Sequence, residues 1–102
     1  MPDARAVLSK LAEIESELRR IEIWQNEPLE PEQYDFRAAF AGDTMSFPQW
    51  LQFVFVPNVR IAAEKGNFPS ESHVAAQAAR EFDTMPAASR LVTLLSEFDA
   101  LF

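Results

Sequence analysis

Apolar residues recur with helical spacing at both ends of the chain. In the segment 3–24 they alternate steps of three and four residues, at Ala4, Val7, Leu11, Ile14, Leu18 and Ile21. Asp3 is placed to cap the first turn of this helix. The segment 86–102 repeats the spacing with Leu91, Leu94, Phe98 and Leu101, and Pro86 suits its first turn. The pattern therefore predicts two amphipathic helices of the kind found in bundles.

Prolines and a glycine divide the chain between these helices. The segment 25–35 combines two prolines with four acidic residues, which predicts a linker, with room for a short helix around 33–40. Gly66 and the proline three residues after it mark a second break. Beyond that break, Ser70 or Ser72 is expected to cap an alanine-rich helix.

The most apolar stretch, FPQWLQFVFVP at residues 47–57, is open to two interpretations. Phe53 to Val56 have high strand propensity, yet no other segment offers a strand to pair with, and an unpaired strand leaves backbone groups unsatisfied. Helix signals also precede it, because Ser46 and Gln49 have the spacing of a capping box and Pro48 suits a first turn. We therefore predict a helix over 47–65.

Pro57 lies inside this predicted helix. A proline there removes the hydrogen bond to the Phe53 carbonyl, so we expect it to kink or break the helix. The helix is apolar nearly all round, which is typical either of a central buried helix or of a face that awaits a partner. If there is an interface, its candidate residues are Trp50, Phe53, Val56 and Pro57, with Trp24 nearby.

Composition supports one globular fold. The 102 residues are 48% hydrophobic and include no cysteine, which excludes disulfides and thiolate zinc sites. We predict an all-α protein, a single compact bundle of four or five helices forming one domain over residues 1–102. No signal peptide or membrane span is evident, so we expect a cytoplasmic protein.

The charge balance bears on the partners. Sixteen acidic residues against nine basic ones give a net charge of −7, which disfavours direct binding of nucleic acid. The acids could instead steer a basic protein partner.

Few residues suggest catalysis. Asp43 and Thr44 could form a carboxylate–hydroxyl site, but such residues before a helix more often cap it, as we also predict for Ser46. His73 is the only histidine, and with the serines beside it in one turn it makes a poor triad. We expect no metal site, no cofactor and no enzyme activity; the alternative is a small enzyme that uses Asp43 or His73.

One longer pattern resembles a known family. The residues F-x-x-D-T-M-x-x-x-x-W-L-Q-F-V-F-V-P, from Phe40 to Pro57, and the terminal D-A-L-F, from Asp99, are similar to those of the YqcC-like family of small bacterial proteins. The resemblance implies a compact all-helical protein of unknown biochemical function. It also implies a genomic association with a tRNA pseudouridine synthase, whose name has become attached to the family.

We therefore expect a binding or accessory protein whose partner is a protein, with a tRNA-modifying enzyme as the candidate. It would act as a monomer or as a homodimer. In the homodimer, the apolar stripe of the first helix would form the contact.

Overall fold

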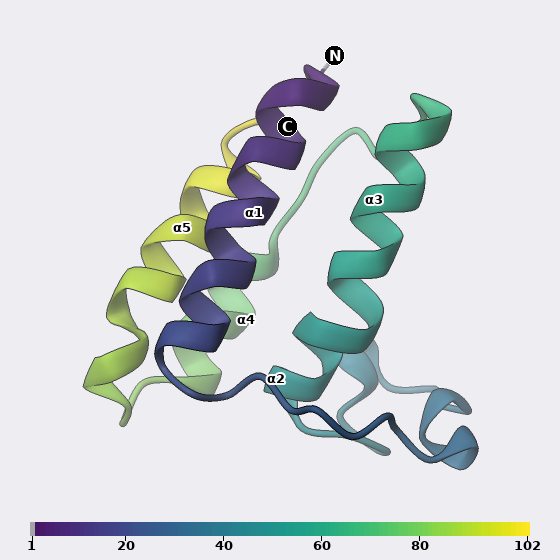
Figure 1. The fold of residues 1–102 in the computed structure, drawn as a ribbon, viewed down its shortest axis with the longest axis vertical. Helices are drawn as coiled ribbons and strands as arrows, with labels where there is room; N and C mark the ends of the chain where they lie inside the picture. Colours follow the sequence, from purple (N-terminus) through teal and green to yellow (C-terminus); the bar gives the residue numbers. More distant parts are fainter. Residues whose placement is uncertain (1) are drawn as a thin grey trace.

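The structure is all-helical, as the sequence predicts. A computed structural model describes residues 2–102, and none of these residues forms a strand. The α-helices are α1 (Ala4–Arg20), α2 (Phe47–Trp50), α3 (Val56–Lys65), α4 (Val74–Glu81) and α5 (Ser89–Asp99) (Figure 1). Short 3-10 turns form at η1 (Pro31–Tyr34), η2 (Ala39–Ala41) and η4 (Pro86–Ala88). Because α2 and α3 are continuous through a π-helical segment, these elements make four helices, within the predicted range.

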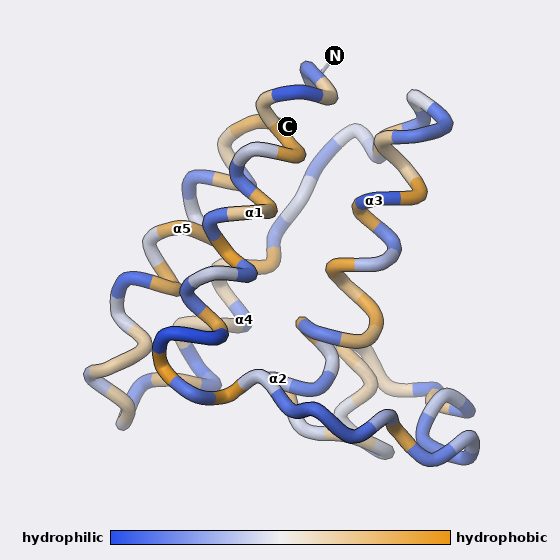
Figure 2. Tube along the Cα trace, in the orientation of Figure 1, coloured by the Kyte–Doolittle hydropathy of each residue, from blue (hydrophilic) through white to orange (hydrophobic). Residues whose placement is uncertain are grey.

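The core is built mainly from α1 and α5, with buried residues of α2, α4 and the π-helical segment packed against them. α1 packs against both α3 and α5, and α4 packs against α5. In Figure 1, α1 and α5 lie side by side at one side of the molecule and α3 stands at the other. The predicted stripe of α1 is buried, with at most 1% of each side chain exposed, at Val7, Leu11, Ile14 and Leu18. The apolar residues recur about once per turn along α1 and α5 (Figure 2).

Burial of this stripe contradicts the hypothesis of a homodimer formed through α1. The α1 residues that would have formed a homodimer contact are already covered by α3 and α5 of the same chain. The outer face of α1 is instead held by ion pairs, from Lys10 to Glu97 of α5 at 2.9 Å and from Glu15 to Arg60 of α3. A dimer through the α1 stripe is therefore wrong for this fold.

Pro57 neither ends nor breaks the helix that contains it. The backbone stays helical from Phe47 to Lys65, the bounds that the sequence predicts. The residues just before the proline form the π-helical segment η3 (Leu51–Phe55), in which the Val56 N–H donates to the Leu51 carbonyl, five residues back. The wider turn is one of the known ways in which a helix accommodates an interruption of its ladder of hydrogen bonds. The predicted break is therefore replaced by a local change of helical register.

The acidic linker is pinned to this π-helical segment. Gln52 is 7% exposed, and its side-chain amide forms two hydrogen bonds with the backbone of one linker residue. Its Oε1 accepts from the Gln25 N–H at 2.9 Å, and its Nε2 donates to the Gln25 carbonyl at 2.7 Å. Further along the segment between α1 and α2, a small second core is formed by Leu29, Ala41 and Met45. Phe53 packs against it. The short helix expected around 33–40 is reduced to the two turns η1 and η2.

Gly66 ends α3 in the left-handed conformation, with φ of 65°. A Cβ atom added at Gly66 or at Gly42 would meet nothing within 4 Å, but Gly42 has an ordinary φ of −62°. We predict that Gly66→Ala lowers the free energy of unfolding by about 1–2 kcal/mol, because an L-residue is strained in this conformation. Gly42→Ala is the control and should be neutral or stabilising by up to about 1 kcal/mol. Urea unfolding measures both; equal losses in the two variants would contradict the conformational explanation.

Candidate functional site

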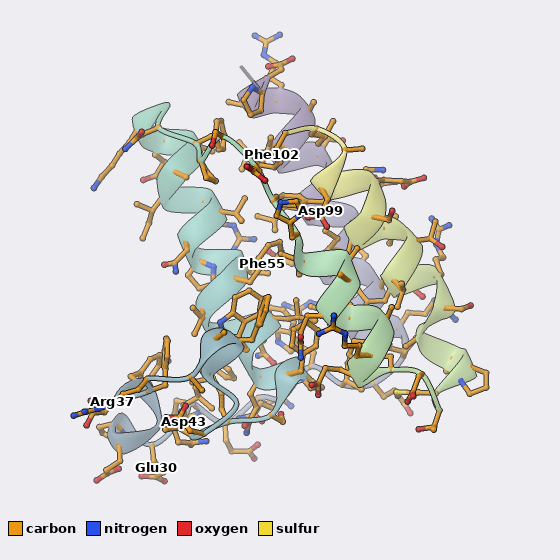
Figure 3. The ribbon with its side chains drawn as sticks, turned by 180° about the vertical axis from the view of Figure 1, so that it is seen from behind. Glu30, Arg37, Asp43, Phe55, Asp99 and Phe102 are labelled. Carbon is orange, nitrogen blue, oxygen red and sulfur yellow. The ribbon has the colours of Figure 1, made fainter. Side chains whose placement is uncertain are left out.

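A partly open apolar pocket lies between α3, the loop that precedes α4 and the end of α5. Its volume is about 340 Å³. The aromatic residues that line it come from distant parts of the sequence: Phe40, Trp50, Phe55, Phe68, Phe98 and Phe102. Figure 3 shows the labelled side chains of Phe55, Asp99 and Phe102 between α3 on one side and α4 and α5 on the other.

The rings that line the pocket form a spatial series in which each ring contacts the next. The Phe55 ring lies 5.6 Å from the Trp50 ring and 5.1 Å from the Phe98 ring. Phe102 continues the series, with centroid distances of 5.0 Å to Phe98 and 5.8 Å to Phe68. These separations are typical of favourable aromatic pairs. The pocket wall is therefore a connected set of rings, of which Phe55 and Phe98 belong to the buried core.

The π-helical turn is what brings Trp50 and Phe55 together. In an α-helix, residues five apart point roughly 140° away from each other. The i to i+5 hydrogen bonding of η3 widens the turn, so the two rings come to lie side by side. The register change before Pro57 thus builds one wall of the pocket.

A strained turn supplies a further ring. Phe40 has φ of 56° and ψ of 21°, and Ala41 has φ of 55°. This left-handed conformation costs a non-glycine residue roughly 1–2 kcal/mol. Packing offsets the cost: the Phe40 ring stands edge-on to Trp50 at 4.9 Å, and Ala41 is fully buried. Strain of this kind is concentrated at functional sites in proteins, which adds weight to the pocket as the candidate site.

The polar rim of the pocket is organised by Asp99. One carboxylate oxygen accepts from the Ser72 hydroxyl and the Val74 N–H, and the other accepts from the Ala75 N–H at 2.8 Å. The prediction that Ser70 or Ser72 caps α4 is therefore wrong. The last residue of α5 satisfies these N–H groups instead, and a carboxylate at a helix N-terminus is also favoured by the helix dipole.

His73 stands exposed at the same rim. Its Nε2 lies 2.6 Å from a carboxylate oxygen of Glu71. The Ser72 hydroxyl donates to Asp99, so Ser72 and His73 each have a partner other than one another. Among these described residues of the rim, the Ser72 hydroxyl is therefore not paired with a base that would activate it as a nucleophile.

Asp43 and Thr44 do not line the pocket; they hold a turn in the segment between α1 and α2. Asp43 accepts from the backbone N–H groups of Arg37 and Ala38, at 3.0 and 3.3 Å. The N–H of Arg37 is the main reason that the pKa of Asp43 is lowered from its ordinary value. Thr44 donates to the Gln33 carbonyl at 2.6 Å. Figure 3 shows Asp43 with Arg37 at the end of the molecule opposite Phe102.

These contacts correct the interpretation of Asp43 and Thr44 as helix caps. The residue that caps α2 is Ser46. Its Oγ accepts from the Gln49 N–H at 3.2 Å, and the Gln49 side chain accepts from the Ser46 N–H at 2.9 Å. This is the reciprocal capping box that the spacing predicts.

The structure does not gather the candidate interface residues on one surface. Val56 is 1% exposed and belongs to the core, so the fold leaves it no place on an interface. Phe53 packs against the second core, and Trp24 lies under Arg19, whose guanidinium carbon is 4.2 Å from the ring centroid. Pro57 is partly exposed. Of the five, Trp50 alone lines the pocket.

The other pocket residues carried little signal in the sequence. Phe55 is one of several apolar residues in the run 47–57, and Phe98 is one of the residues of the helical stripe of α5. Phe68 stands in a proline-flanked loop, where an aromatic residue has no helical or strand pattern to explain it. That unexplained aromatic in a loop is the one signal that could have indicated the site.

Comparison with known proteins agrees with the all-helical fold. A sequence profile of the family described as "tRNA pseudouridine synthase C" matches residues 6–101. The chain belongs to this YqcC-like family. The solution NMR structure of the protein YqcC from E. coli matches it with a TM-score of 0.87 and 26% sequence identity, over 99% of this chain and 88% of that one. An uncharacterized protein of Haemophilus influenzae is 32% identical over 57 residues, which are 56% of this chain and 54% of that protein.

Two features bear on the kind of site in residues 2–102, the part of the chain that the structure describes. No helix there is long and apolar enough to cross a membrane. No three His, Asp or Glu side chains there are grouped as metal ligands would be.

We predict that Asp99→Asn loosens the α4 end of the pocket. An amide cannot accept from all three donors in the same geometry, so the free energy of unfolding should fall by about 1–2 kcal/mol, the usual cost of losing an N-cap. The control is Asp83→Asn, at an exposed carboxylate between α4 and α5. Urea unfolding would compare the two, and equal stabilities of the two variants would contradict the role of Asp99.

Proposed function

We propose that this protein is an accessory protein that binds a segment of another protein in the aromatic pocket, and that it is not an enzyme. The observation that carries the proposal is the pocket itself, about 340 Å³ in volume and lined by six aromatic residues. Aromatic side chains in concave, water-excluding sites supply a large share of binding energy in protein complexes. Two features that cost conformational energy, the π-helical turn and the strained Phe40, both contribute to this wall.

The polar groups support binding over catalysis. Asp43, one of the two candidate catalytic residues, uses its carboxylate to hold a turn and does not line the pocket. The other, His73, pairs with Glu71 at the rim, while Ser72 is committed to Asp99. An apolar wall with such a rim suits recognition of a side chain more than general acid–base chemistry.

The candidate partner is a tRNA pseudouridine synthase of the same organism. The description of the family names that enzyme, which supports an association with it. The net charge of −7 argues against a direct role in holding tRNA and suits contact with a basic protein surface. Such a partner would place the protein in the cytoplasm.

The test fills the pocket without removing a core residue. Ala62 of α3 lines the pocket and is partly buried, so Ala62→Leu should block the site while preserving the helix. Ala76→Leu on α4 is the matched control, because Ala76 is exposed and does not line the pocket. Tagged wild-type protein and both variants would be mixed with the purified tRNA pseudouridine synthase after nuclease treatment.

We expect the wild type and Ala76→Leu to retain the synthase, and Ala62→Leu to bind it at least about tenfold more weakly, a difference of about 1.4 kcal/mol. Retention by all three proteins would exclude the pocket as the contact. Absence of retention by the wild type would exclude this partner.

A further inference from the structure

We infer that the aromatic pocket takes a lysine or arginine side chain of a partner protein, together with an apolar residue beside it. This inference rests on the proposed function and specifies the chemistry of the segment that docks. It follows from the charges at the rim, from the electrostatics of the aromatic wall and from the size of the pocket.

The charged groups at the pocket favour a cation. The titratable side chains that line it are Glu71 and His73, and none of the lining residues is a lysine or arginine. Glu71 is exposed, and its recorded contact is the one with His73, so the carboxylate has capacity to accept from a further donor. Asp99, below the rim, is already occupied by three donors. Arg60, on the neighbouring part of α3, is paired with Glu15 of α1.

The aromatic wall favours the same sign of charge. Each ring carries negative potential on its faces, and lysine and arginine side chains bind there by cation–π interaction, most strongly to tryptophan. This chain already uses the interaction once, between Arg19 and Trp24. At the pocket, Trp50 is partly exposed; Phe47 stacks on it with 5.7 Å between the ring centroids, Phe40 stands edge-on to it and Phe55 is tilted against it. Phe68 and Phe102, which also line the pocket, are partly exposed as well. An anionic ligand would be repelled by the faces of these rings and by the carboxylate of Glu71.

The pocket has room for more than a single ring. Its volume of about 340 Å³ is over twice that of the roughly 150 Å³ apolar cavity that is known to bind benzene. A lysine or arginine has an apolar stem and a charged end, so the stem can contact the rings while the charge reaches the rim. The remaining space accommodates an apolar neighbour.

Two small probes of matched shape test the inference. They are 3-phenylpropylamine, which is a cation at neutral pH, and 3-phenylpropionate, which is an anion; each has one phenyl ring and a three-carbon chain. Each would be titrated into the isotope-labelled protein and followed by NMR at the two indole N–H groups. Trp50 lines the pocket, and Trp24 does not, so the second indole is an internal control.

We expect the amine to shift the Trp50 indole resonance and to bind at least about tenfold more tightly than the carboxylate. Glu71→Gln should reduce that preference to about threefold or less, while Glu32→Gln, at an exposed acid of η1, should leave it unchanged. Ala62→Leu should weaken both probes.

Equal binding of the two probes would overturn the inference about charge. So would a shift at Trp24 in place of Trp50, or no binding of either probe. None of these results decides whether the synthase binds, which the Ala62→Leu experiment measures separately. The two proposals can therefore fail independently.

Discussion

Pro57 imposes the constraint on which the rest of the structure depends. It has no N–H to donate, and in an unmodified α-helix its ring would clash with the carbonyl four residues back. The chain accommodates it by widening the preceding turn into η3 and keeps one continuous helix. This change of register places Trp50 beside Phe55 and turns Gln52 toward the linker backbone. One wall of the pocket and the attachment of the linker both use residues of this widened turn.

The helices themselves could be predicted from the sequence, because they depend on local patterns. The stripes of α1 and α5 have helical spacing, and the helix over 47–65 begins at a capping box and ends at Gly66. In each case the residues that determine the element lie within it or next to it. The absence of a partner strand was enough to overrule the strand propensity of Phe53 to Val56.

The details that build the site could not be predicted, because they depend on contacts between distant residues. The carboxylate that caps α4 lies 25 residues beyond Val74, so a search for local caps found the neighbouring serines. Phe40 and Ala41 adopt the left-handed conformation although a glycine follows them, since packing against Trp50 and the second core outweighs the local preference. The sequence predicted a kink or a break at Pro57, and it did not predict the wider turn that keeps the helix continuous.

The link from Asp99 to α4 also sets an order of assembly. A ribosome makes the chain from its N-terminus, so Val74 and Ala75 emerge before the carboxylate that will bind them. Phe98, which joins the Phe55 ring to the rest of the wall, emerges equally late. The pocket is consequently complete only after α5 has been synthesised and has packed against α4 and Phe55. A nascent chain cannot engage a ligand there before its own helices have docked.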